Sequence, residues 1–111
     1  YDLAEAERWS QHLATLAEEQ LAELPGFRSF RSGNASLLAF EFAGLHHSDL
    51  VTLLAEQGIA LRAGQHCAQP LLAALGVSGT LRASFAPYNS LQDVDALVRA
   101  MKGAISLLSE F

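Results

Sequence analysis

Large apolar residues recur at every second position in two segments of the chain, and this pattern restricts the fold more than any other feature. The residues that fall on one side of these segments are Leu38, Phe40, Phe42, Leu81, Ala83 and Phe85. Polar residues such as Glu41 and Arg82 fall on the other side. A period of two is typical of strands with one buried face, so we expect strands over residues 36–42 and 80–85. The sheet that contains them then packs helices on one face, and its other face is exposed or covered by something else.

An amphipathic helix is predicted at the beginning of the chain, over residues 2–24, and Pro25-Gly26 ends it. Its apolar stripe comprises Leu3, Leu13, Leu16, Ala17, Leu21 and Leu24. Its acidic residues lie mostly off that stripe, at Glu5, Glu7, Glu18, Glu19 and Glu23. We interpret the acidic face as solvated surface; a face that docks a partner is the alternative, which no residue requires.

A second long helix is predicted at the end of the chain, after a loop over residues 86–89. Ser90 and Asp93 have the spacing of a capping box, which marks a helix start. The core stripe of this helix comprises Val94, Leu97, Val98, Met101, Ile105 and Leu108.

The segment between the end helices begins with a predicted hairpin. Residues 27–31 form its first strand and residues 36–42 its second, because Ser32-Gly33-Asn34 is a turn signal. A helix follows, which Ser48 or Asp49 is expected to cap. That helix runs to Gln57 and ends at a left-handed Gly58; its apolar face comprises Leu50, Val51, Leu53 and Leu54.

The region before the strand at 80–85 mixes short elements. Residues 59–62 predict a short strand, and a polar loop over residues 63–69 follows it. Pro70 suits the first position of a short helix, which Gly76 ends. Ser78-Gly79 then predicts a turn.

These elements predict one domain over residues 1–111, of the α+β class, in which helices pack on one face of a small sheet. Half of the residues are apolar, which is enough for a core without a metal or a disulfide. No repeat or low-complexity tract divides the chain.

The charge and the composition exclude several classes of function. The net charge is -5 and the seven basic residues are scattered, which argues against nucleic acid or an anionic membrane as a partner. No apolar run is long enough to span a bilayer, and the N-terminus lacks a signal pattern. The one cysteine, Cys67, excludes an internal disulfide and favours a reducing, cytoplasmic setting.

Cys67 is the strongest candidate for chemistry. It lies among polar residues just before a predicted helix start, where backbone N–H groups favour a thiolate. Arg62 and His66 add positive charge nearby, which would lower the thiol pKa. A lone cysteine is more often a small buried hydrophobe, and the Arg-x-Gly-x-His-Cys context is what favours the reactive interpretation. His46, His47, His66 and Cys67 lack the spacing of a zinc site, so we expect no metal.

Residues 62–70, Arg-Ala-Gly-Gln-His-Cys-Ala-Gln-Pro, resemble the active-cysteine loop of the second group of cysteine desulfurases, in the class-V aminotransferase family. Residues 81–85, followed by Tyr88-Asn89, are similar to the same family, and Gly44–Asp49 strengthens the likeness to its CsdA-like members. The loop and the strand arginine at this spacing are together a specific signal, and the similarity extends over nearly the whole chain.

The resemblance implies a pyridoxal-phosphate enzyme that converts L-cysteine to L-alanine. In it the thiolate of Cys67 takes the substrate sulfur as a persulfide and passes it to an acceptor protein, of the CsdE or SufE kind, for uses such as iron–sulfur clusters. Arg82 would bind the substrate carboxylate, since a guanidinium matches a carboxylate with two parallel bonds. Arg62 and His66 would support the loop or the thiol; a surface ion pair for Arg82 and an ordinary loop position for His66 are the alternatives.

The chain lacks the expected cofactor lysine. Its one lysine, Lys102, is predicted on the surface of the last helix. The resemblance places the Schiff-base lysine in a preceding large domain, so the chain is expected to be the C-terminal small domain of a longer, homodimeric enzyme and inactive alone. The first residue, Tyr1, fits that expectation.

Two other functions stay open at this stage. One is a stand-alone sulfur carrier with a persulfide on Cys67, against which the substrate-type Arg82 argues. The other is an interaction domain in which Cys67 is inert. The pKa of the thiol distinguishes the second alternative from a reactive site.

Overall fold

The structure is a computed structural model that describes residues 2–64 and 80–109. It contains the helices α1 (Leu3–Leu21), α2 (His47–Glu56) and α4 (Leu91–Leu108) and the strands β1 (Phe27–Ser29), β2 (Leu37–Phe42), β3 (Arg62–Gly64) and β4 (Thr80–Ser84). The predicted polar loop beyond Gly64, the short helix from Pro70 to Gly76 and the turn at Ser78-Gly79 lie outside the described residues, as do His66 and Cys67.

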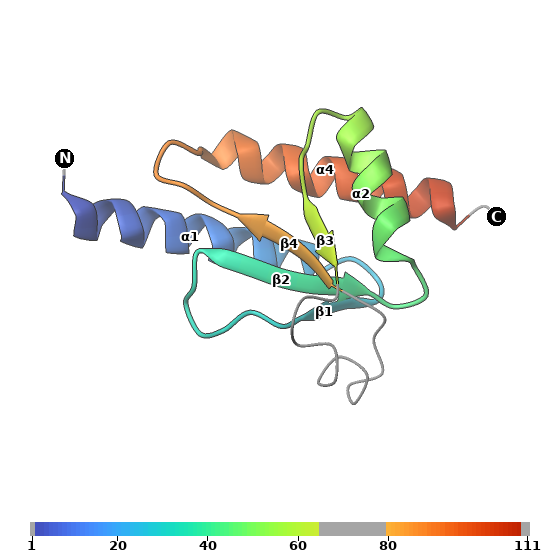
Figure 1. Cartoon of the computed structure of the whole chain (residues 1–111), viewed down its shortest axis with the longest axis horizontal. Helices are drawn as coiled ribbons and strands as arrows, with labels where there is room; N and C mark the ends of the chain where they lie inside the picture. Colours follow the sequence, from blue (N-terminus) through green and yellow to red (C-terminus); the bar gives the residue numbers. More distant parts are fainter. Residues whose placement is uncertain (1, 65–79, 110–111) are drawn as a thin grey trace.

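The four strands form one antiparallel sheet in the order β1-β2-β4-β3. The predicted hairpin of β1 and β2 is confirmed, with Phe27 opposite Phe42 and a turn in which the Ala35 N–H donates to the Ser32 carbonyl. β4 pairs with β2 although residues 43–79 separate them in sequence. Figure 1 shows the sheet with α1 and α4 running along one side of it.

One face of the sheet carries the core. The alternation predicted for β2 and β4 is confirmed, because every residue of the apolar set is at least nine-tenths buried: Leu38, Phe40, Phe42, Leu81, Ala83 and Phe85. Phe27 adds a third ring beside Phe40 and Phe42. The helices supply the other half of this core with Leu13, Ala17, Leu21, Leu50, Leu54, Val94, Leu97 and Met101. The α+β architecture with helices on one face is therefore confirmed.

The opposite face of the sheet, which we call the outer face, follows from the same register. It carries Arg28 on β1, Leu37, Ala39 and Glu41 on β2, Arg62 on β3, and Arg82 and Ser84 on β4. On β2 and β4 the residues between these positions are buried in the core, because successive side chains of a strand alternate between faces.

Helix boundaries agree with the sequence except at two points. α1 ends at Leu21 rather than at 24, and Leu3 is 78% exposed because the N-terminal end of α1 extends beyond the strands (Figure 1). α2 is capped by His46, whose Nδ1 accepts from the Ser48 N–H, and not by Ser48 or Asp49. The capping box of Ser90 and Asp93 on α4 is confirmed.

The strand predicted over residues 59–62 is wrong in position, since β3 spans Arg62–Gly64. Gly58 is left-handed as predicted, with φ 79°. The Ile59 N–H donates to the Leu54 carbonyl, so the chain is still completing the end of α2 at Ile59. Pairing with β4 begins only at Arg62.

Polar contacts fasten the hairpin to α1. Arg31, just after β1, is almost fully buried and donates four hydrogen bonds: to the carbonyls of Gln11 and Ala35, to Thr15 Oγ1 and to Glu18. Ser29 also bonds to Glu18. At Gly26 a side chain would meet the backbone N of Ala43 at 3.1 Å, and the φ of 83° favours glycine as well.

Within residues 2–64 and 80–109, no helix combines the length and the apolar character needed to cross a membrane.

Candidate functional site

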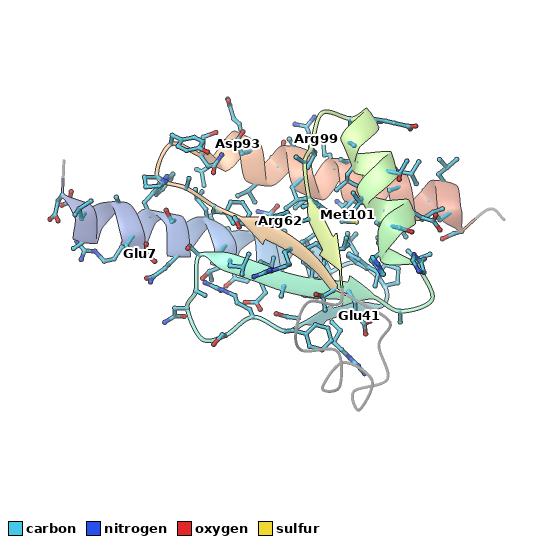
Figure 2. The ribbon with its side chains drawn as sticks, viewed as in Figure 1. Glu7, Glu41, Arg62, Asp93, Arg99 and Met101 are labelled. Atoms are coloured by element: carbon cyan, nitrogen blue, oxygen red, sulfur yellow. The ribbon has the colours of Figure 1, made fainter. Side chains whose placement is uncertain are left out.

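Two arginines lie directly opposite each other on the outer face. Arg82 is the central residue of β4, and the antiparallel register pairs it with Arg62 on β3. On its other side, Arg82 faces Ala39 of β2, whose side chain is too short to crowd a guanidinium. Arg82 is partly buried and Arg62 is exposed. Figure 2 labels Arg62 and shows the side chains around it. The structure thus brings together two of the four predicted site residues.

Direct cross-strand pairing of like charges is unfavourable by itself. Within the described parts of the chain, neither Arg62 nor Arg82 forms an ion pair or a side-chain hydrogen bond. Two adjacent cations without a protein partner there fit a bound anion, such as a carboxylate, which a pair of guanidinium forks can hold with several charge-assisted bonds.

A third arginine on the outer face has a carboxylate partner. Arg28 lies opposite Glu41 in the β1–β2 register, and its Nη1 is 3.5 Å from Glu41 Oε1. The Arg28 side chain is 54% exposed and that of Glu41 is 19% exposed. Arg28 also lies 6.0 Å from the centre of the Phe30 ring. No sequence motif marks this pair; only the hairpin register places Arg28 and Glu41 opposite each other.

The predicted nucleophile and its neighbour, Cys67 and His66, lie outside the described residues, and no statement on their geometry follows. Their link to the arginines is one of sequence. Arg62 precedes Cys67 by five residues, and β3, which carries Arg62, ends three residues before Cys67.

The histidines of the α2 start have structural contacts. His46 caps α2 as described above, and its ring stacks on that of His47 at 4.3 Å. Burial and the neighbouring His46 lower the pKa of His47, which disfavours its charged form. Among residues 2–64 and 80–109, no three side chains of the metal-ligating types come together.

Lys102 does not lie with the arginines. It is exposed on α4, a helix that packs on the core side of the sheet. The described part of the chain therefore offers no lysine on the outer face for a Schiff base with pyridoxal phosphate.

Three cavities bounded by described residues lie away from Arg62 and Arg82. The two between α2 and α4 have volumes of about 330 and 370 Å³ and share Gln57, Arg99 and Ala100. The third, of about 310 Å³, lies where the chain before β3 separates from the end of β4. Because none of these three cavities is lined by Arg62 or Arg82, we place the candidate site on the outer face and not in a cavity.

A family model described as Aminotransferase class-V matches residues 1–97. The chain belongs to the class-V aminotransferase family. Within that family it is 73% identical to cysteine desulfurase CsdA of Escherichia coli over 97% of its own length, and 50% identical to a probable cysteine desulfurase of Pasteurella multocida. The chain spans only about a quarter of these relatives, 27% and 26% of their lengths.

The solved structures of this family agree with the fold described here. The crystal structure of E. coli cysteine desulfurase CsdA in an S-sulfonic acid form superposes with a TM-score of 0.91 at 72% identity, over 96% of this chain and 27% of that one. The apo cysteine desulfurase of Thermococcus onnurineus superposes with a TM-score of 0.83 at 34% identity, over 94% of this chain and 27% of that one. The resemblance found in the sequence is confirmed.

Proposed function

We propose that this chain is the C-terminal small domain of a cysteine desulfurase, to which it supplies the sulfur-accepting thiol of Cys67 and the substrate-binding guanidinium of Arg82. The observation that carries the proposal is the cross-strand pair of Arg62 and Arg82, two cations without a protein partner among the described residues. The 73% identity to a cysteine desulfurase supports the carboxylate of L-cysteine as the anion that such a pair would bind.

In the proposed reaction, L-cysteine and the Cys67 thiol give L-alanine and a Cys67 persulfide. The substrate carbon–sulfur bond breaks, a sulfur–sulfur bond forms on Cys67, and a proton replaces sulfur on the product carbon. Arg82 fixes the substrate through its carboxylate, so that the sulfur is held for attack by the thiolate. Arg62 adds a second positive charge to the carboxylate site, and His66 tunes the thiol.

Pyridoxal phosphate would act in the longer protein and be held by residues outside this chain. The exposed position of Lys102 does not fit a cofactor lysine. We propose in addition that the longer protein is a cytoplasmic homodimer. It would pass the persulfide sulfur to an acceptor protein of the kind that feeds iron–sulfur clusters.

The test uses the longer, cofactor-loaded protein. Cys67→Ala should abolish persulfide formation and alanine release, because no thiol receives the sulfur, and should leave the absorbance of the bound cofactor unchanged. Arg82→Gln should raise KM for L-cysteine roughly 10- to 100-fold, the loss expected for a charge-assisted contact.

A Cys67→Ala enzyme that still forms alanine at the wild-type rate would contradict the proposal. The chain alone gives a second test. It should show no visible Schiff-base absorbance with pyridoxal phosphate and release no alanine from L-cysteine. If the chain alone accepts a persulfide on Cys67 from a separate desulfurase, and Arg82→Gln has no effect in the longer protein, the sulfur-carrier alternative holds instead.

A further inference from the structure

The outer face holds one carboxylate between two arginines. Glu41 lies directly opposite Arg28 on β1. On its other side, the β2–β4 register pairs Ala39 with Arg82 and Phe40 with Leu81, so Glu41 is a diagonal neighbour of Arg82. Figure 2 labels Glu41 on β2 and Arg62 on β3, and β4 lies between these two strands in the sheet.

Glu41 can reach either arginine. Diagonal neighbours on one face of an antiparallel pair lie about 7–8 Å apart, which long side chains span. The side chain of Glu41 is only 19% exposed, so its carboxylate has little access to water and gains most from a cationic partner. In the structure that partner is Arg28, at 3.5 Å.

We propose that Arg28 is a positioning residue, which holds Glu41 and thereby keeps Arg82 free to bind the anionic substrate. Without Arg28, Glu41 turns to Arg82 and becomes an internal competitor for the same guanidinium. The substrate carboxylate then has to displace a tethered carboxylate, whose effective concentration is high because it is part of the same sheet. The inference rests on the proposed role of Arg82 as the carboxylate-binding residue.

The kinetic test uses the longer, cofactor-loaded protein and a rescue. Arg28→Gln should raise KM for L-cysteine about 10-fold with kcat nearly unchanged, since it weakens substrate binding but does not affect the attack of the Cys67 thiolate on the substrate sulfur. Arg28→Gln combined with Glu41→Gln should bring KM back to within about 2-fold of wild type, because the competing charge is gone. Arg28→Lys should stay close to wild type, since it keeps a cation opposite Glu41.

The matched control is Arg99→Gln. It breaks a different arginine–carboxylate pair, the exposed one with Asp95 on α4, a helix that packs on the core side of the sheet. Its KM should equal that of wild type. A merely structural role of Arg28 predicts that the double variant is as impaired as Arg28→Gln or more, and this result would overturn the inference, as would an unchanged KM in Arg28→Gln.

A measurement without turnover separates this inference from the proposed function. In the chain itself, the side-chain Nε–Hε NMR signal of Arg82 should shift in Arg28→Gln, as Glu41 pairs with it, and return in the double variant. An Arg82 signal that does not respond to Arg28→Gln overturns the positioning role whatever the enzyme binds. If the signal responds but Arg82→Gln leaves KM unchanged, Glu41 does pair with Arg82 in the absence of Arg28, and the assignment of Arg82 to the substrate is what fails.

Discussion

Arg31 and Arg82 lie on neighbouring parts of one small sheet domain, yet their surroundings are opposite. Arg31 lies where the hairpin meets α1, its side chain is 3% exposed, and it donates four hydrogen bonds to groups of this chain. Arg82 lies on the outer face opposite another arginine, and no hydrogen bond or ion pair engages its side chain within the described residues. The Arg31 guanidinium therefore stabilises the fold, whereas the Arg82 guanidinium has no such role among the described residues.

This difference shows how a structural cation is distinguished from a binding one. Burying a guanidinium is unfavourable unless its donors are paired, and at Arg31 they are. Placing two guanidinium groups side by side is also unfavourable, and at Arg62 and Arg82 nothing among the described residues offsets it. A pair of like charges that does not stabilise the fold points to a role other than stability. The contrast therefore predicts large stability effects at one site and small effects, of opposite sign, at the other.

The largest expected effect is at Arg31. Arg31→Met should lower the free energy of unfolding by about 3 kcal/mol, because it removes the cation beside Glu18 and the hydrogen bonds that the Gln11 and Ala35 carbonyls accept from the guanidinium. Urea unfolding of the chain measures the loss. Arg99→Gln, at an exposed arginine paired within α4, is the control and should leave the stability close to that of the wild type. Equal effects of the two substitutions would contradict the structural role of Arg31.

A smaller effect is expected at Thr15, which shares the Arg31 network. Its hydroxyl accepts from Arg31 at 2.9 Å and donates to the Gln11 carbonyl at 3.0 Å. Thr15→Val keeps the shape, removes both bonds and should cost about 1 kcal/mol in urea unfolding.

Thr52 offers a matched control for Thr15. Its hydroxyl makes the same bond to a carbonyl four residues earlier, that of Ser48, but it is exposed and has no arginine beside it. Thr52→Val should be close to neutral. In the Arg31→Met background, Thr15→Val should cost less than it does alone, because the shared contact is already lost. Additive effects would show that Thr15 and Arg31 act separately.

Sequence patterns predicted the core side of this domain better than its junctions. The period of two identified Leu38, Phe40 and Phe42 as buried, and Ser90 with Asp93 marked the start of α4, because these signals are local. The start of β3 was misplaced, since residues 59–61 are apolar, but the backbone of Ile59 still completes the end of α2 and pairing with β4 begins only at Arg62. The cap of α2 at His46 was missed for a different reason: histidine is an uncommon cap, whereas serine and aspartate, which follow at Ser48 and Asp49, are common ones.

The candidate site was predicted only in part. Arg82 was assigned to the polar face of its strand from alternation, but its direct pairing with Arg62 depends on the β3–β4 register, which joins residues about twenty positions apart. The Arg28–Glu41 pair required the hairpin register. Alternation shows which face of a strand a residue occupies, because a register shift of one residue moves every side chain to the other face. A shift of two residues keeps the faces, so alternation does not identify the residue that lies opposite on a distant strand.

The smallest expected effect is a gain in stability on the outer face. Arg62→Gln removes one of two like charges that face each other across β3 and β4, and it should stabilise the chain by about 0.3 kcal/mol at low salt. Added salt screens the same repulsion in the wild type, so the difference between the two proteins should shrink as ionic strength rises towards about 1 M. Paired urea unfolding curves at low and high salt measure both effects. If Arg62→Gln instead destabilises the chain by 1 kcal/mol or more, Arg62 has a structural partner, and the contrast with Arg31 from which the binding role was inferred no longer holds.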